Sequence, residues 1–338
     1  MSARAAVLPV FVPHLGCEHT CVFCNQRRIS GQEKPASCED VTDIIRKSAS
    51  FLPPGGKRQL AFYGGSFTAI PTPEQEALLG AALEAKTRGE IDSIRLSTRP
   101  DAIDDTVLAR LRRCGVETVE LGAQSMDDEV LRLSGRGHTA EDVERASRLL
   151  KGAGLRLILQ MMTGLPGATA ASDIETARKL IALRPDGVRI YPTVIVRDTA
   201  LYDMWRAGLY REHTVEDAVE LCARIVPLFE AAQIPVIRLG LNPTEELTAG
   251  AAVAGAYHPA LGELVKSRIL LHRAEALLDG IEPGSRVTLA VGRGRRSQMA
   301  GQHRENIRRL TENFSLAGLE IREDEHILGE IALVSIEK

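Results

Sequence analysis

Six apolar segments, each followed by a segment with helical periodicity, constrain the fold of this chain more than any other feature. They occupy residues 6–12, 59–65, 93–99, 118–124, 156–164 and 187–195. Near-continuous apolar runs are typical of strands that are buried on both faces of a parallel sheet. Their alternation with helices over the first 235 residues predicts a parallel α/β barrel or a doubly wound sheet.

Capping residues support the helices between these strands. Thr139 precedes an amphipathic segment, and a threonine there can accept a hydrogen bond from the first helical turn. Thr72 with Gln75, and Ser172 with Glu175, have the spacing of a capping box. We therefore expect helices to begin at about these three places.

The chain divides into three regions by composition. Residues 1–240 contain the predicted barrel. Residues 241–283 are first rich in Gly, Ala and Pro and then helical in pattern, which predicts a linker and a helix. Residues 284–338 have the pattern strand, helix, strand, strand, which predicts a small α+β module.

Composition excludes several classes of protein. Hydrophobic residues at 44% and charged residues at 26% are ordinary for a globular protein. A net charge of -3 argues against a protein that binds nucleic acid over its whole surface, but it allows a local basic patch. We expect no signal peptide and no membrane-spanning segment, and therefore a cytoplasmic protein. Clustered cysteines in a reducing compartment indicate metal ligands rather than disulfides.

Three cysteines lie within eight residues, just after the first predicted strand: Cys17, Cys21 and Cys24. Three interpretations remain open from the residues themselves. They are buried structural thiols, a zinc site completed by His14 or His19, and an iron–sulfur cluster with one open iron. Zinc frameworks usually have two separated arms, whereas this chain has one compact triad. The scattered cysteines are Cys38, Cys114 and Cys222.

Further candidate ligand groups follow the predicted strands. Gly64 and Gly65 close the second strand, where they could admit a ligand close to the backbone or simply form a tight turn. Gln124 ends the fourth strand, at the edge where parallel α/β folds bind ligands. Arg136 could grip a carboxylate or lie in solvent. The segment "TGLPG" (163–167) could line an adenine or connect a strand to a helix.

In combination, these motifs resemble the radical S-adenosylmethionine superfamily. The spacing Cys-x3-Cys-x2-Cys with Phe23 before its last cysteine is similar to the superfamily signature. "GGSF" (64–67) and "GLPG" (164–167) resemble its amino-binding and adenine-binding motifs. Residues 7–240 resemble the radical domain of the Elongator catalytic subunit and its bacterial relatives, through "STRPD", "ELGAQS", "GRGHT", "MMTGLPG" and "RIYPTVIVRDTALYDMWRAGLY".

The resemblance implies an enzyme with a partial (β/α)6 parallel barrel of the TIM type and a small C-terminal α+β module. Cys17, Cys21 and Cys24 would hold a 4Fe–4S cluster, whose open iron binds S-adenosylmethionine. Reductive cleavage of that cofactor would give a deoxyadenosyl radical, which abstracts hydrogen from the substrate. An electron donor such as flavodoxin or ferredoxin would be a partner.

The resemblance also implies contacts between particular residues and S-adenosylmethionine. Gly64 and Gly65, followed by Ser66, would receive the methionine ammonium. Arg136 would pair with the carboxylate, and Gln124 would face the ribose.

Other implied contacts surround the adenine. Phe23 and Leu165 would flank this ring, with Gly164 beside Leu165. Ser97 stands where the Elongator pattern has Glu, so one contact around the cofactor differs.

Arg189 and Tyr191 are candidate catalytic residues on the substrate side. Alternation along the sixth strand directs both to one face, and Ile190 to the other. If that face is the barrel interior, they could contact a polar or anionic substrate. The alternative is a hydrogen-bonded pair that only fills the barrel.

The C-terminal module carries a basic segment. Between residues 286 and 309 there are seven Arg and one Glu. "AGQHRENIRRL" faintly resembles the loop and helix of KH-type RNA-binding modules, although Arg304 replaces a glycine of that pattern. The alternative is a solvated basic helix.

Two functions are compatible with these features. One is a radical enzyme that modifies RNA, with tRNA as its partner. The other is a radical enzyme that acts on a small molecule, such as a porphyrin-type oxidative decarboxylase. A non-enzymatic iron–sulfur or zinc protein leaves "GGSF", "GRGH" and "GLPG" unexplained. We expect no acetyltransferase domain in this chain, and the Elongator reaction on the tRNA wobble uridine uses one.

Overall fold

The computed structural model describes residues 6–12, 15–17, 21–25, 34, 36–48, 56–242, 247–327 and 330–338. The chain forms two compact units. The first consists of Met1–Thr214 and Leu228–Tyr257, and the second of Val215–Pro227 and His258–Lys338. The division falls inside one helix, α9 (Val215–Ala231).

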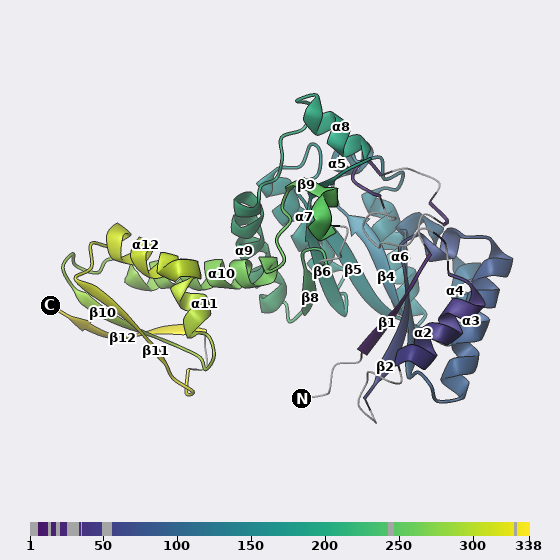
Figure 1. Cartoon of the computed structure of the whole chain (residues 1–338), viewed down its shortest axis with the longest axis horizontal. Coiled ribbons are helices and arrows are strands. Elements are labelled where there is room, and N and C mark those ends of the chain that lie inside the picture. Colours follow the sequence, from purple (N-terminus) through teal and green to yellow (C-terminus); the bar gives the residue numbers. More distant parts are fainter. Residues whose placement is uncertain are drawn as a thin grey trace. The chain divides into compact units, whose positions relative to one another are not determined.

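A seven-stranded parallel sheet, curved into a half-barrel, forms the centre of the first unit (Figure 1). All six predicted strands are present, and they lie in the sheet in chain order. The sheet consists of β1 (Ala6–Phe11), β2 (Arg58–Tyr63), β3 (Ser93–Thr98), β4 (Val116–Gln124), β5 (Arg156–Thr163), β6 (Gly187–Pro192) and β8 (Val236–Leu239). The predicted α/β half-barrel is therefore confirmed.

The prediction of six strands was short by one. β8 pairs with β6 in parallel, beginning with Val188 opposite Val236. It has only four residues, none of which is fully buried. Because β8 lies at the sheet edge, it lacks the buried apolar run by which the other strands are recognised.

Helices connect the strands and cover the outer face of the half-barrel (Figure 1). Apolar side chains such as Ile94 and Leu96 of β3 point to this covered face and are fully buried. The helices of the first unit are α2 (Cys38–Ser48), α3 (Thr72–Thr87), α4 (Asp105–Arg113), α5 (Asp128–Leu133), α6 (Ala140–Gly152), α7 (Ala170–Ala182) and α8 (Ala200–Arg206). Short 3-10 turns lie at Phe67–Ala69 and Pro100–Ala102.

One of the three predicted helix caps is confirmed. Thr139 caps α6 in a capping box with Asp142. The cap of α7 is Thr169, with Ser172 at the third helical position, so the prediction of Ser172 as a cap was wrong. Pro71 precedes α3 without a side-chain cap. The predicted partner Gln75 is instead buried.

A two-stranded antiparallel sheet follows the half-barrel. It pairs β7 (Val194–Val196) with β9 (Ala252–Gly255). β9 lies in the segment predicted as a linker, and a short π-helical turn (Leu247–Ala251) precedes it. The predicted sixth strand is interrupted at Thr193, whose hydroxyl donates to Thr163 O at 2.7 Å.

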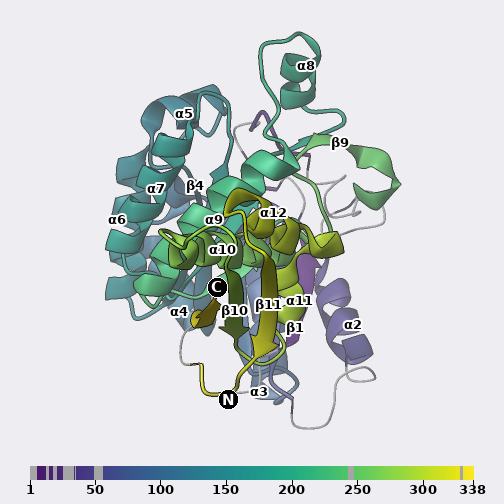
Figure 2. The ribbon, with the colours of Figure 1, turned by 90° about the vertical axis from the view of Figure 1, so that its left-hand side faces the viewer.

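The second unit packs helices on one face of a three-stranded sheet (Figures 1 and 2). The central strand is parallel to one neighbour and antiparallel to the other, in the order β11-β10-β12. Its elements are α10 (Leu261–Leu278), β10 (Arg286–Val291), α11 (Arg296–Ala300), a 3-10 turn (Gln302–Arg304), α12 (Glu305–Asn313), β11 (Gly318–Glu323) and β12 (Ile331–Glu337).

The three predicted C-terminal strands are confirmed, whereas the predicted single helix is two. Residues 301–304 separate α11 from α12, and His303 and Arg304 have φ of 50° and 60°. Leu310 is buried in the core, with Ile307 and Phe314 packed against it. These three residues form the apolar side of the segment.

Candidate functional site

The loop that carries the three cysteines is docked onto the turn after β2. Gly65 has no Cβ, and a Cβ there would lie 2.4 Å from Leu15 O and 2.5 Å from Val12 O. Gly16 has φ 69°, and its Cβ would lie 2.3 Å from Ser66 O. Ser66 N donates to Leu15 O at 3.0 Å. The two glycines therefore allow two backbones to touch.

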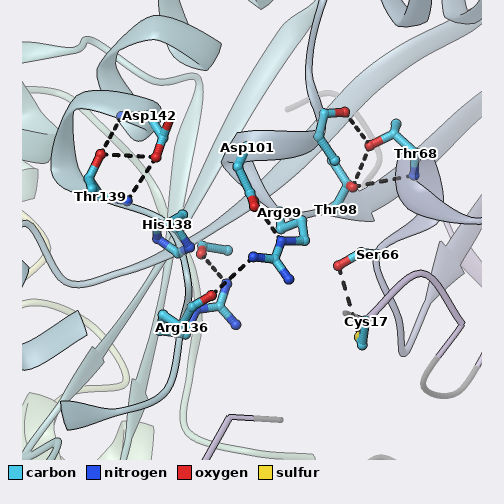
Figure 3. A network of polar contacts seen from close by, with 12 residues as sticks. Cys17, Ser66, Thr68, Thr98, Arg99, Asp101, Arg136, His138, Thr139 and Asp142 are labelled. Atoms are coloured by element: carbon cyan, nitrogen blue, oxygen red, sulfur yellow. Dashed lines mark hydrogen bonds and ion pairs between the residues drawn. The ribbon is translucent and has the colours of Figure 1, made fainter. Parts of the chain in front are cut away.

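The three clustered cysteines lie at the carboxyl edge of the sheet. Cys17 Sγ lies 4.0 Å from Ser66 Oγ (Figure 3). Cys21 Sγ accepts a hydrogen bond from Arg136 Nη1 at 3.1 Å. Cys24 N donates to Cys21 O at 3.1 Å, which closes a turn between them. Cys17 is exposed, and the other two are half-buried.

The other cysteines lie elsewhere in the fold. Cys38 begins α2, Cys114 ends α4, and Cys222 is buried within α9. The described residues contain no group of three or more His, Cys, Asp and Glu side chains placed to hold a single metal ion. His14 and His19, the residues of the zinc alternative, lie outside the described residues.

Two arginines bring positive charge to the cysteines. Arg136 Nη2 donates to Gly122 O at 2.8 Å, and its Nε is buried without a partner among the described residues. Arg99 Nη2 donates to Arg136 O at 3.1 Å (Figure 3). Burial lowers the pKa of Arg99, but its hydrogen bond and ion pair with Asp101 raise it above the ordinary value.

A glycine inside β4 makes room for these groups. A Cβ at Gly122 would lie 2.9 Å from Gln124 Nε2 and 3.3 Å from Arg136 Nη2. Gln124 has φ 65°, an uncommon backbone conformation for a residue with a side chain, and its Oε1 accepts from Gln160 Nε2 at 3.3 Å. Sequence reasoning missed Gly122, although a glycine within a buried strand often marks a close approach.

His138 is a buried, neutral imidazole behind Arg136. It is 4% exposed, and its Nε2 lies 3.1 Å from Ala123 O. Burial, followed by the charge of Arg136, lowers the pKa of His138 to about 4. It therefore adds no positive charge to the site at neutral pH.

The segment predicted to line an adenine is clamped from three sides. Gly164 N donates to Asp173 Oδ2 at 2.9 Å, and Gly164 O accepts from Tyr210 Oη at 2.6 Å. A Cβ at Gly164 would lie 2.3 Å from His213 Cγ. Burial raises the pKa of Asp173 to about 7. Sequence reasoning missed all three partners of Gly164.

Phe23 and Leu165, predicted on either side of one ring, lie in the same apolar cluster. Leu165 is buried with Val130 and Met162, and Phe23 packs against them. Phe23 lies on the cysteine loop and Leu165 on the turn after β5. The cluster thus joins two of the predicted cofactor segments.

The predicted substrate residues face the inside of the half-barrel. Ile190 is fully buried, whereas Arg189 and Tyr191 are half-buried and hydrogen-bonded to each other, from Nη1 to Oη at 3.2 Å. The predicted alternation on β6 is therefore confirmed. Ser97, on β3, donates to Phe62 O at 3.3 Å.

Sequence reasoning missed three residues of the network around Arg189: Tyr63, Arg95 and Glu120. Glu120 accepts hydrogen bonds from Tyr63, Arg95 and Arg189. Arg95 and Glu120 are charged residues within otherwise apolar strands, and this was the signal that could have identified them.

No helix among the described residues is long and apolar enough to cross a membrane.

Similarity to known proteins extends across the half-barrel. Residues 11–181 match the model of the radical SAM superfamily, and residues 185–270 match the radical SAM C-terminal domain. The tRNA uridine(34) acetyltransferase of Methanocaldococcus infernus is 30% identical over 188 residues. Human Elongator complex protein 3 is 32% identical over 192 residues. These matches cover 50% and 51% of this chain but 35% of each relative.

Solved structures resemble the fold. The archaeal Elp3 of Methanocaldococcus infernus with an N-terminal deletion superposes with a TM-score of 0.64 at 24% identity. That match covers 81% of this chain and 64% of the other. Methylornithine synthase superposes with a TM-score of 0.50 at 18% identity, over 76% of this chain and 73% of the other. The match over residues 11–181, which is half of the chain, shows that the chain belongs to the radical SAM superfamily.

Proposed function

We propose that this radical SAM enzyme modifies RNA, with a tRNA base as its substrate. The curated relatives that match at 30–32% identity are a tRNA uridine(34) acetyltransferase and Elongator complex protein 3. The match covers about a third of the length of these relatives and about half of this chain. The reaction that we propose for this chain is the radical step.

The superfamily uses a 4Fe–4S cluster and S-adenosylmethionine. We propose Cys17, Cys21 and Cys24 as the cluster ligands. Their loop is held against the turn after β2, and Arg136 reaches Cys21. The ligands of a cluster bind different irons, so they need not converge as the ligands of a single ion do. The donor set and its position at the strand ends both fit the cluster.

When bound, the cluster and S-adenosylmethionine supply the radical chemistry, and the chain supplies orientation. Arg136 has a buried Nε without a described partner, which is a donor available to a carboxylate. We assign Gly64 and Ser66 to the methionine ammonium. Gly65 contributes by allowing the cysteine loop to dock.

We assign the remaining cofactor contacts to the turns after β4 and β5. Gln124 faces the ribose, and its side chain is held by Gln160. Phe23 and Leu165 form the apolar surface for the adenine. Gly164 keeps this turn in place through its bond to Asp173. Ser97 is bonded to the backbone and supports the neighbouring strand.

The second unit supports the choice of RNA. Exposed arginines without an ion pair in the described structure lie around α11 and α12: Arg293, Arg296, Arg304 and Arg308. Arg295 and Arg309 are instead paired with Glu330 and Glu275. Unpaired arginines on one module are suited to contact phosphates.

Hydrogen bonds from Asn306 hold the turn between α11 and α12. Asn306 Nδ2 donates to Met299 O at 3.1 Å and lies 2.9 Å from Ser267 Oγ. Arg304 has φ 60°, a conformation that favours glycine, at the position where KH modules have one. We therefore propose that residues 284–338 present RNA to the enzyme.

Anaerobic reconstitution with S-adenosylmethionine, a reductant and bulk tRNA tests the proposal. We expect a nucleoside of changed mass after digestion, together with deoxyadenosine and methionine. The Cys21→Ala variant is the negative control, and Cys38→Ala is the matched control that keeps activity. Cofactor cleavage without any changed nucleoside would exclude tRNA and favour a small-molecule substrate. Flavodoxin or ferredoxin is the electron donor that we predict.

A further inference from the structure

The inner face of the half-barrel is polar and accessible, whereas its outer face is apolar and covered. On β3, Ile94 and Leu96 point outward and are fully buried, and Arg95 between them points inward and is half-buried. β6 repeats this pattern around Arg189. Half-buried arginines on the inner face are therefore not part of a packed apolar core.

Three side chains on this face meet at the carboxylate of Glu120, and a fourth, Tyr191, joins the network through Arg189. Arg95 Nη1 lies 2.7 Å from Glu120 Oε1, and Arg189 Nη2 lies 3.0 Å from the same oxygen. Arg189 Nε lies 2.9 Å from Oε2. Tyr63 donates to Oε1 at 3.0 Å, and Tyr191 Oη accepts from Arg189. The strands β2, β3, β4 and β6 each contribute to this network.

The network carries an excess of positive charge. Two guanidinium groups meet one carboxylate, and Glu120 is the only carboxylate within ion-pair distance of either arginine in the described structure. Burial, together with the charge of Glu120, raises the pKa of Tyr63, so this phenol stays neutral. The exposed fractions of the Arg95, Arg189 and Glu120 side chains are 11%, 13% and 3%.

An uncompensated charge at this depth is costly unless a partner neutralises it. Arg95 Nε is a buried donor without an acceptor in the described structure. Arg238 of β8 stands opposite Arg189 in the sheet register, which adds a third arginine to the neighbourhood. Guanidinium donors in this arrangement suit an anion with more than one acceptor oxygen.

Arg95, Arg189 and Glu120 lie deeper in the half-barrel than the residues assigned to S-adenosylmethionine. Arg136 binds the carbonyl of Gly122, at the rim of the sheet. Glu120 precedes Gly122 by two residues on the same face of β4, which is about 6–7 Å further into the half-barrel. A group that enters past the cofactor therefore meets Arg95 and Arg189.

We propose that Arg95 and Arg189, positioned by Glu120, bind an oxyanion of the substrate inside the half-barrel. The group is a phosphate or a carboxylate. The identity of the molecule that carries this oxyanion rests on the proposed function. With an RNA substrate, the oxyanion is a phosphate of the nucleotide that reacts. Glu120 is a positioning residue that holds both guanidinium groups. Its negative charge limits the net charge of the three groups to one positive charge.

Calorimetric titration of the reconstituted enzyme with sodium phosphate and with sodium acetate, at ionic strength matched with chloride, tests the site. We expect Arg95→Gln to weaken anion binding about tenfold or more, the loss of one charged hydrogen-bonding partner. Glu120→Gln should strengthen it, because the excess rises to two charges. Arg132→Gln is the matched control, since this arginine is 68% exposed in a surface ion pair. If Glu120→Gln fails to fold, Arg95→Lys, which keeps the charge, should retain most of the binding that Arg95→Gln loses.

The outcomes distinguish two questions: whether the anion site exists, and which class of molecule supplies the anion. Equal anion binding by wild type, Arg95→Gln and Arg132→Gln overturns the proposal. Tighter binding of 5′-UMP than of uridine, lost in Arg95→Gln, identifies the phosphate of a nucleotide. A preference for acetate over phosphate, also lost in Arg95→Gln, keeps the anion site and overturns the RNA substrate. Failure of tRNA modification alone leaves these binding results unchanged.

Discussion

Arg136 Nη1 lies 3.1 Å from Cys21 Sγ, although 115 residues separate them in the chain. This contact joins the loop after β1 to the loop that follows α5. Because parallel strands end at one edge of the sheet, residues that are distant in sequence meet there. The contact places a fixed positive charge beside a thiol that we assign to the cluster.

Alanine substitution of each cysteine tests the cluster assignment. Cys17→Ala, Cys21→Ala and Cys24→Ala should lose iron, since only these three share one loop. Iron and sulfide content, together with absorbance near ~400 nm, measure the cluster. Cys38→Ala and Cys114→Ala are the matched controls. Loss of iron in Cys114→Ala but retention in Cys21→Ala would contradict the assignment.

Arg136→Gln should weaken S-adenosylmethionine binding by on the order of 2–5 kcal/mol, because it removes one partner of a charged pair. Equilibrium binding to the reconstituted enzyme measures this loss. Iron content is measured in the same samples, since Arg136 also contacts Cys21. Arg132→Gln, on the exposed face of α5, should bind the cofactor like wild type. Unchanged affinity in Arg136→Gln would place the carboxylate elsewhere.

Gly65→Ala should undock the cysteine loop. Its Cβ would lie 2.4 Å from Leu15 O, and neither backbone can move without breaking the contact. We expect a loss of about 1–3 kcal/mol in unfolding free energy, with lower iron content after reconstitution. Gly80→Ala is the control, because nothing lies within 4 Å of its Cβ. In the middle of α3 this change should add about 0.5–1 kcal/mol. Equal effects of the two substitutions would refute the docking role.

Asp173 should make the folded state less stable as pH rises from about 4 to about 7. Its folded pKa is raised to about 7, so the folded state binds the extra proton in this window. The stability lost across it is on the order of 4 kcal/mol. Asp173→Asn keeps an oxygen to accept from Gly164 N and removes the titration. The variant should therefore be more stable than wild type at pH 8, measured by denaturant unfolding.

His138 has the opposite effect over an overlapping window. Its folded pKa is lowered to about 4, so the unfolded state binds the extra proton between about pH 4 and 6.5. Stability from this group rises with pH across that window. In Asp173→Asn, the stability of the folded state should rise with pH, because only the effect of His138 remains. In His138→Gln, it should fall with pH, because only the effect of Asp173 remains. Parallel pH profiles in wild type and both variants would show that neither group titrates in this way.

Replacing Arg304 and Arg308 with Glu should weaken RNA binding and leave cofactor cleavage unchanged. The slope of log affinity against log salt is about −0.7 for each phosphate contacted on a single strand, so the slope should become shallower by about 1.4. Arg322→Glu is the control in the same unit, since Arg322 is already paired with Glu320. Identical salt slopes for wild type and the double variant would remove these arginines from the interface.

Six of the seven strands of the half-barrel, the cysteine motif and the order of the ligand loops could be predicted from the sequence alone. Each of these depends on local information. Six strands carry their own buried apolar runs, and Thr139 lies next to the helix that it caps. The face on which Arg189 and Tyr191 lie also follows from alternation along one strand. Local patterns of this kind are visible without knowledge of any partner.

Which distant residues come into contact could be seen only in the folded chain. Glu120 binds arginines from two other strands, and Asp173 holds Gly164 across a turn. Gly65 is required because another loop occupies the space where its Cβ would lie. β8 could not be recognised, since an edge strand of four residues has no buried run of its own. Contacts, burial and the pKa shifts that follow from burial depend on residues that are far apart in the chain. These residues become neighbours only when the sheet forms, so local sequence patterns do not reveal them.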